Sequence, residues 1–330
     1  MAFDRVNLAA AAPKPEAAPK PEAAPKTAEW IAYRERGSLA LLRFMAFLSM
    51  RLGRKLSRIP LFGIATYFFL FAPRARRHSR RYLRRALGRE PHARDRFRHI
   101  LYFATTIHDR VFLINRQYES FRITIEGEAL MREQAERGVG ALLMGAHMGS
   151  FEVIGSIGRR RPGLQVSMAM YEDNARKINS ILTAIDPAVR PDIISLGHLD
   201  AMLKVAERLD RGAFVGILGD RTLGEEAVHR VSILDARAYL PTGPMRAAAI
   251  LRRSVIFMVG LYRGGNHYHV VFEPVADFSA SSVTTRDEAV RTGVERYAAL
   301  LDKYCRSDPY NWFNFFDFWQ EPTHTRKPPP

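Results

Sequence analysis

The chain has 330 residues, 47% of them hydrophobic, with one cysteine and a formal net charge of +16. This apolar content can bury a large core, which excludes a fully disordered chain, and the lone Cys305 excludes an intrachain disulfide scaffold. The segment from Arg34 to Arg110 carries a net charge of +15, and the remainder carries +1. This basic segment predicts a negatively charged partner, which is a membrane surface, a nucleic acid or an acidic protein.

The N-terminal residues 1–28 predict an extended tether. They repeat Ala-Ala-Pro-Lys-Pro-Glu at 11–16 and at 17–22. Proline every few residues prevents both helix and sheet, and the segment has no apolar surface to bury. The start of the chain lacks a basic stretch followed by an apolar run, so we expect no signal peptide.

Residues 29–118 predict a basic helical membrane-docking region that packs on the catalytic domain. Two apolar runs, Ser38–Met50 and Ile59–Pro73, are too short for an orthodox membrane-spanning helix. Basic residues flank them: Arg51, Arg54, Lys55, Arg58, Arg74, Arg76 and Arg77. Core helices and elements lying on an anionic membrane surface both remain open interpretations. In the segment Arg94–Arg116, apolar residues recur every three or four positions, which predicts an amphipathic helix.

Residues 119–330 predict a catalytic domain in which short strands alternate with helices. The expected strands are Phe121–Ile125, Ala141–Met144, Gln165–Met170, Asp192–Ser195, Ala213–Leu218, Val255–Tyr262 and Tyr268–Phe272. The expected helices are 128–137, 150–159, 174–185, 199–210, 243–252 and 286–305. This alternation predicts an α/β fold with a mixed, mostly parallel sheet flanked by helices, and sites in such sheets form at the carboxyl ends of strands.

A histidine and a carboxylate follow the expected strand Ala141–Met144, in the stretch Gly145-Ala146-His147-Met148-Gly149-Ser150-Phe151-Glu152. We predict that Glu152 accepts a hydrogen bond from one imidazole nitrogen of His147, so that the other nitrogen acts as a general base. Gly149 would let backbone and substrate approach closely. A structural histidine remains an alternative. So does Ser150 as a nucleophile, although it lacks a Gly-x-Ser-x-Gly elbow. The other histidines lack ligand spacing, so we expect no metal site.

Four ordered blocks carry a family resemblance. His147-x4-Glu152 resembles the His-x4-Asp/Glu signature of the lysophospholipid-type acyltransferase superfamily, in the branch of the late acyltransferases of lipid A biosynthesis. The similarity runs from about Trp30 to Trp319. The other blocks are Tyr171 after a strand, Gly219-Asp220-Arg221 after another, and Leu240-Pro241-Thr242-Gly243-Pro244 before a helix. The ending Pro309–Trp319 resembles a subgroup of predicted bacterial acyltransferases.

This resemblance implies a glycerolipid-acyltransferase-like fold and acyl transfer from a thioester to a hydroxyl of a lipid or lipid-like acceptor. The donor would be acyl carrier protein or coenzyme A, with no further cofactor. By the same resemblance His147 is the general base and Glu152 its orienting partner. The substrate-binding residues would be Gly149, Tyr171, Asp220, Arg221, Thr242 and Gly243.

Two departures from the family pattern bear on the acceptor. The chain has Asp220-Arg221 where the lipid A enzymes commonly have Asp-Gln or Asp-His, and Tyr171-Glu172-Asp173 where they often have Tyr-Arg-Pro. One cation is lost and another gained, which changes the anionic group that the site can hold. A phosphorylated glucosamine is therefore not the expected acceptor, whereas the acyl-transfer chemistry is retained.

The residues also have local interpretations. A thioester oxyanion needs donors, for which backbone N–H groups near Gly149 and the Arg221 guanidinium are the candidates. Arg221 could instead be a structural partner of Asp220 or Glu225. Thr242 is a plausible helix cap, and the same helix start could hold an anionic headgroup. The aromatic tail Tyr310–Trp319 is expected to pack in the core or at a membrane interface.

We therefore expect an O-acyltransferase at the cytoplasmic face of the bacterial inner membrane, peripheral or monotopic, with acyl carrier protein and membrane lipids as partners. A lipid or thioester hydrolase, in which water replaces the acceptor, is the alternative on the same site. A nucleic-acid-binding protein is the third possibility. The basic segment has no recognisable reader motif, and its charges border apolar runs, so we expect no nucleic-acid partner.

Overall fold

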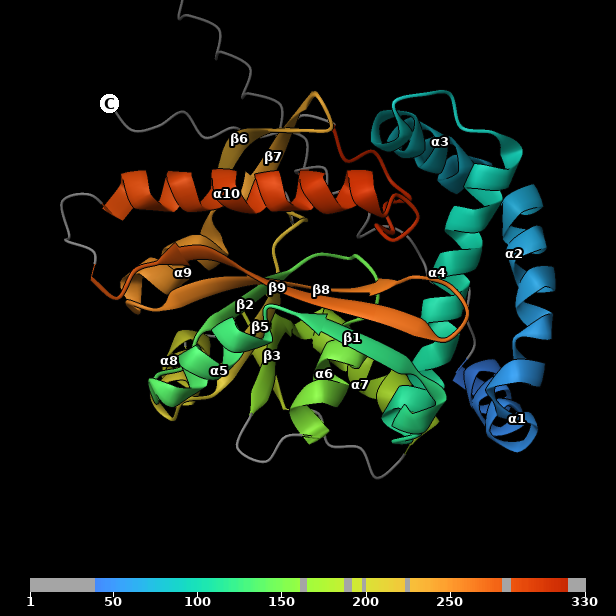
Figure 1. Cartoon of the computed structure of the whole chain (residues 1–330), viewed down its shortest axis with the longest axis horizontal. Helices are drawn as coiled ribbons and strands as arrows, with labels where there is room; N and C mark the ends of the chain where they lie inside the picture. The colour runs from blue at the N-terminus through green and yellow to red at the C-terminus, as the bar shows by residue number, and fades with distance from the viewer. Residues whose placement is uncertain are drawn as a thin grey trace, which may run out of the picture.

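The computed structural model describes residues 39–160, 165–186, 192–197, 200–222, 226–280 and 286–319 (Figure 1). The predicted tether 1–28 lies outside the described residues. The described part has an α/β fold in which helices flank a mixed, mostly parallel sheet, so the predicted fold class is confirmed.

Four helices open the described chain and lie along one edge of the molecule (Figure 1): α1 (Leu39–Ser57), α2 (Ile59–Phe71), α3 (Pro73–Leu87) and α4 (Ala93–Ile114). A proline occupies the first turn of both α2 and α3, where its missing N–H has no helical partner to lose. Gly88 ends α3 in the left-handed conformation, at a φ of 64°. Among the described residues, no helix is both long enough and apolar enough to cross a bilayer.

The central sheet has seven strands in the order β1-β9-β8-β2-β5-β3-β4. Their bounds are β1 (Arg122–Glu126), β2 (Leu142–Gly145), β3 (Val166–Tyr171), β4 (Ile193–Leu196), β5 (Phe214–Leu218), β8 (Ser254–Tyr262) and β9 (His267–Asp277). Neighbouring strands are parallel except for the antiparallel pair β8 and β9. All four residues of β2 are buried, as expected for a parallel strand covered on both faces.

Helices cover both faces of this sheet (Figure 1). The helix α10 crosses one face, and α5, α6, α7 and α8 lie on the other. The remaining bounds are α5 (Glu128–Glu136), α6 (Phe151–Arg160), α7 (Glu172–Ile185), α8 (Ala201–Asp210), α9 (Gly243–Ile250), α10 (Arg286–Ser307) and a 3₁₀ turn, Tyr118–Ser120.

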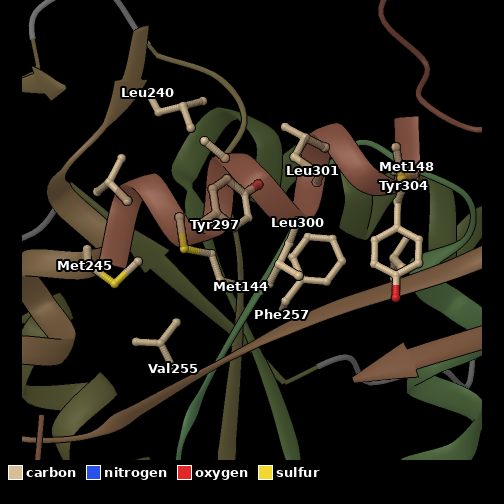
Figure 2. Packing of buried hydrophobic residues seen from close by; sticks show 14 of the residues in the cluster. Met144, Met148, Leu240, Met245, Val255, Phe257, Tyr297, Leu300, Leu301 and Tyr304 are labelled. Atoms are coloured by element: carbon tan, nitrogen blue, oxygen red, sulfur yellow. The ribbon is translucent and has the colours of Figure 1, made fainter. Parts of the chain in front are cut away.

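The core beneath α10 fixes the carboxyl end of β2. Figure 2 shows Tyr297, Leu300 and Tyr304 of α10 directed toward Met144 of β2 and Phe257 of β8. The rings of Phe257 and Tyr304 stack with their centroids 5.5 Å apart. The buried Tyr297 hydroxyl donates a hydrogen bond of 2.7 Å to the carbonyl of Gly145, the last residue of β2. The backbone at the start of the turn that follows β2 is therefore held in place.

A buried charge cluster ties the opening helices to the sheet. Arg54 of α1 donates two hydrogen bonds, of 2.8 and 2.7 Å, to the two carboxylate oxygens of Asp109 on α4. Tyr268 of β9 donates a third, of 2.9 Å, to the same carboxylate. Because Asp109 is fully buried, these donors offset the cost of desolvating its charge, and α1, α4 and β9 are held together.

The sequence missed one element, the antiparallel pair β6 (Val228–Ile233) and β7 (Ala236–Pro241). Its two-residue turn is formed by Leu234 and Asp235, both at positive φ. Such turns normally carry asparagine or glycine, so the sequence gives no turn signal here. The Leu234 side chain is buried against the core, which offsets the strain at this position.

Candidate active site

The site forms where two adjacent parallel strands end. His147 lies two residues after the end of β2, and Asp220 lies two residues after the end of β5. Because β2 and β5 are paired in parallel, their carboxyl ends share one edge of the sheet and bring both side chains together. The Nδ1 atom of His147 lies 2.8 Å from Oδ1 of Asp220, a residue 1% exposed.

Asp220 is an ionised carboxylate held by three donors. In addition to the imidazole, its Oδ2 atom accepts hydrogen bonds from the His147 backbone N–H, at 3.1 Å, and from the Trp312 indole N–H, at 2.9 Å. Burial raises the pKa of Asp220, but His147, Arg221 and Trp312 together outweigh it and hold that pKa well below its usual range. The carboxylate therefore keeps its charge and fixes the imidazole.

This arrangement leaves one ring nitrogen of His147 able to accept a proton. With Nδ1–H donated to the carboxylate, Nε2 carries the free lone pair, and the side chain is 34% exposed. Desolvation lowers the pKa of His147, the Asp220 carboxylate opposes that shift, and Arg221 adds to it, so the net shift is downward. The imidazole is therefore neutral near neutral pH and can accept a proton at Nε2.

Glu152 does not occupy the predicted position beside the imidazole. It lies in the first turn of α6 and faces α4, where its Oε1 atom is 2.5 Å from Nε of Arg110. The hydroxyl of the buried Ser150 donates to Oε2 of the same residue, at 3.3 Å. The predicted Glu152–His147 hydrogen bond is thus replaced by Asp220–His147, and the Ser150 hydroxyl is directed to Glu152 instead of His147.

The backbone N–H groups of Gly149 and Ser150 already have acceptors within the protein. Gly149 donates its N–H to the carbonyl of Asn311 at 2.9 Å, and Ser150 donates to the carbonyl of Gly260 at 2.8 Å. Gly149 has a φ of 65°, and a Cβ there would lie 2.0 Å from the Gly260 oxygen. Close packing against β8 therefore accounts for this glycine. Of the predicted oxyanion donors, Arg221 and the N–H groups in the first turn of α6, which begins at Phe151, remain candidates.

A comparison with known families assigns the chain to one of them. The family model described as bacterial lipid A biosynthesis acyltransferase matches residues 26–321, which is most of the chain. The chain belongs to this family. The predicted family resemblance is therefore confirmed, and membership indicates acyl transfer to a lipid. No curated protein gives a significant match.

Arg221 of the acyltransferase lies next to the His147–Asp220 pair and is largely withdrawn from water. Its Nη2 atom donates to the carbonyl of Phe313 at 3.2 Å, and its guanidinium carbon lies 5.0 Å from the ring centroid of Phe316. Burial lowers the pKa of Arg221, and the Asp220 carboxylate opposes that shift. The predicted alternative partner Glu225 lies outside the described residues.

The other predicted substrate-binding residues occupy two places. Tyr171 ends β3 beside β5, at the same sheet edge as His147, and is 38% exposed. Its hydroxyl donates a hydrogen bond of 2.8 Å to Glu226, which the sequence did not single out. Thr242 and Gly243 join β7 to α9 instead. Within the described residues, no hydrogen bond links Thr242 to the His147–Asp220 pair.

Thr242 also differs from its predicted capping role. It occupies the position before α9, but its hydroxyl donates to the carbonyl of Ala227 at 3.1 Å and makes no cap to the helix. Its backbone N–H donates to the same carbonyl, at 2.9 Å. Thr242 therefore fixes the end of β7 against Ala227, the residue that precedes β6.

The sequence missed Trp312 as a partner of Asp220 and Arg110 as the partner of Glu152. The aromatic tail was expected only to pack, yet the Trp312 N–H contacts Asp220 directly. A buried tryptophan needs an acceptor for its N–H, which is the one signal that pointed beyond packing. Arg110 gave no signal, because its pairing with Glu152 depends on how α4 lies against α6.

Proposed function

We propose that this acyltransferase moves a fatty acyl group from a thioester, carried by acyl carrier protein, to a hydroxyl of a lipid acceptor. The observation that supports this most strongly is the His147–Asp220 pair, which has Nδ1 held by a buried carboxylate and a partly exposed ring. A fixed neutral imidazole is the group needed to deprotonate an attacking hydroxyl.

The reaction follows from these positions. His147 Nε2 removes the proton of the acceptor hydroxyl as its oxygen attacks the thioester carbonyl carbon. A new C–O bond forms, and the negative charge of the tetrahedral intermediate develops on the former carbonyl oxygen. The Asp220 carboxylate stabilises the imidazolium meanwhile. When the intermediate collapses, the C–S bond breaks and His147 returns the proton to the leaving thiolate.

Arg221 is our candidate for stabilising the oxyanion. It follows Asp220 directly, and its charge lies in a largely desolvated setting, where electrostatic stabilisation is stronger than in water. Tyr171 at this edge donates to Glu226, and the residue after it is Glu172, where the lipid A enzymes often have a cation. A neutral hydroxyl-bearing acceptor fits this edge better than one with a phosphate.

A lipid acceptor and a long acyl chain reside in a membrane. We therefore propose that α1 and α2 bind the membrane surface. We call their exposed apolar side chains the apolar face; it includes Phe44, Phe47, Ile59, Phe62, Leu70 and Phe71. In α2 only Leu61 and Ala65 are buried. A soluble surface rarely exposes so many large apolar side chains on two consecutive helices, and a lipid bilayer would cover them. We propose the cytoplasmic side of the inner membrane, peripherally.

The helix α3 offers a different surface to the donor. Arg74, Arg77 and Arg84 are exposed, and none of them pairs with an acidic residue among the described contacts. We call these three the arginine face. Acyl carrier proteins are acidic, so we propose that this face attracts the donor electrostatically.

The test is a transfer assay. Purified enzyme receives acyl carrier protein bearing a labelled acyl chain, together with vesicles of total bacterial lipid. We expect labelled lipid, and we expect His147→Ala to lower turnover by about 100-fold or more. His229→Ala is the matched control, because His229 also pairs with a carboxylate, at 3.0 Å, but on β6. Release of free fatty acid without labelled lipid would instead show a hydrolase.

A further inference from the structure

Trp312 makes a direct contact with the catalytic pair from the C-terminal segment. Its indole N–H donates a hydrogen bond of 2.9 Å to Asp220 Oδ2, and Trp312 is 1% exposed. We propose that Trp312 is a positioning residue, which holds the Asp220 carboxylate in the one orientation that fixes the Nδ1–H tautomer of His147. This inference rests on the proposed function in taking His147 as the base.

The two carboxylate oxygens of Asp220 have different hydrogen-bond partners. Oδ1 faces the imidazole, whereas Oδ2 accepts the His147 backbone N–H and the Trp312 N–H. Among the described residues, Trp312 is the one side chain that donates to Oδ2. Rotation of the carboxylate would break all three bonds at once, so the indole opposes the rotation that would release the imidazole.

The indole is itself fixed on several sides. Its ring packs edge-to-face on Tyr82 of α3, with centroids 5.2 Å apart, and on Phe318, at 4.7 Å. Its backbone carbonyl accepts a hydrogen bond of 2.8 Å from Nε2 of His99 on α4. The other ring nitrogen of His99 is bonded to the Ser79 hydroxyl, at 2.9 Å. The opening helices therefore fix the donor that fixes Asp220.

The segment around Trp312 also braces the catalytic turn through the backbone. Met148 and Trp312 form an antiparallel bridge, and the Phe313 N–H donates to the His147 carbonyl at 2.9 Å. Both members of the pair are thus tied to one short stretch of the tail. A tryptophan that only fills space also needs an acceptor for its N–H, but any carbonyl would serve, as the Ile233 carbonyl does for Trp319.

Trp319 supplies a matched control. It packs in the same aromatic cluster, with its ring 6.2 Å from that of Trp312. Its N–H also donates a hydrogen bond, but to the carbonyl of Ile233 at 3.2 Å, away from the catalytic pair. If changing Trp312 lowers kcat and the same change at Trp319 does not, the contact with Asp220 is responsible. If both changes lower kcat, packing is responsible.

The test replaces each indole with 3-benzothienylalanine, which keeps the ring shape but has sulfur in place of the N–H. At position 312 we expect kcat to fall about 10- to 100-fold, the effect of one hydrogen bond to a charged group, with KM for the donor within about 2-fold. At position 319 we expect kcat within about 2-fold of the unmodified enzyme. Trp312→Phe should follow the first result.

A second readout does not depend on turnover. With one donor removed, more negative charge on the carboxylate faces His147, so its titration should move to higher pH. The shift is measured on ¹⁵N-histidine-labelled protein, in which His147→Gln identifies the resonance. An unchanged kcat and titration at position 312, or equal losses at both positions, would overturn the proposal. If the unmodified enzyme transfers no acyl group but the titration shifts, the function fails and the positioning role stands.

Discussion

Arg110 of α4 and Glu152 of α6 form an ion pair, with 2.5 Å between Nε and Oε1, beside the catalytic turn and not within it. Both side chains are largely buried, at 16% and 15% exposure. The carboxylate of the His-x4-Glu motif therefore joins two helices, and Asp220 holds the histidine.

This pairing predicts that Glu152→Gln acts mainly on stability. The substitution leaves the Arg110 charge without its partner, which should cost about 1–3 kcal/mol of unfolding free energy. Arg110→Met in the same chain should recover most of that loss, because the uncompensated charge is removed as well. Urea unfolding of the two single variants and the double variant measures the coupling. Additive losses would contradict the ion pair.

His99 predicts a pH dependence of stability. Burial lowers the pKa of His99 to about 4, below its ordinary value near 6.5. As pH falls from about 6.5 toward 4, His99 binds a proton in the unfolded state but not in the folded state. The unfolding free energy therefore decreases over this range. The loss should approach about 3 kcal/mol. The unfolding free energy, measured by urea unfolding at several pH values from 7 to 4.5, should fall less steeply with decreasing pH for His99→Gln than for the parent protein.

The apolar face predicts membrane binding without a stability cost. Replacing Phe62, Leu70 and Phe71 by serine should weaken binding to anionic phospholipid vesicles at least about 10-fold, because apolar area that enters the bilayer is lost. Leu203→Ser on α8 is the control, since Leu203 is 67% exposed but lies outside the apolar face. Vesicle sedimentation measures the binding, and equal binding by both variants would contradict this surface.

The arginine face predicts an effect specific to a protein donor. Arg74→Glu combined with Arg77→Glu should raise KM for acyl carrier protein about 10-fold, with an effect that diminishes at high salt. The KM for an acyl-coenzyme A donor should change less, because coenzyme A presents a smaller charged surface. Arg291→Glu, an exposed arginine of α10, is the matched control. A KM that is unchanged for both donors would exclude this docking surface.

Much of the fold could be predicted because its signals are local. Apolar runs bounded by polar turns placed six strands to within one residue at each end, whereas β9 continues to Asp277, five residues beyond its predicted end. The position of His147 after β2 followed from these runs. The β6–β7 pair was not predicted, because Leu234 occupies a turn position that usually carries asparagine or glycine.

The histidine's partner could not be predicted from spacing. Asp220 meets His147 only because β5 pairs with β2, and strand order is a property of the whole sheet. Trp312 and Asp220 are 92 positions apart in the sequence, so their contact depends on the C-terminal segment folding back onto the site. Glu152 is near His147 in sequence, but the helix start directs its side chain toward Arg110.

The most direct test of the catalytic arrangement compares single-turnover acyl transfer by His147→Ala, Asp220→Asn and Glu152→Gln, each as folded protein. The first two should lose about 100-fold or more, because one removes the base and the other removes the charge that sets its tautomer. Glu152→Gln should retain activity within about 10-fold of the parent protein. A larger loss for Glu152→Gln than for Asp220→Asn would contradict the assignment of Asp220 as the partner of His147.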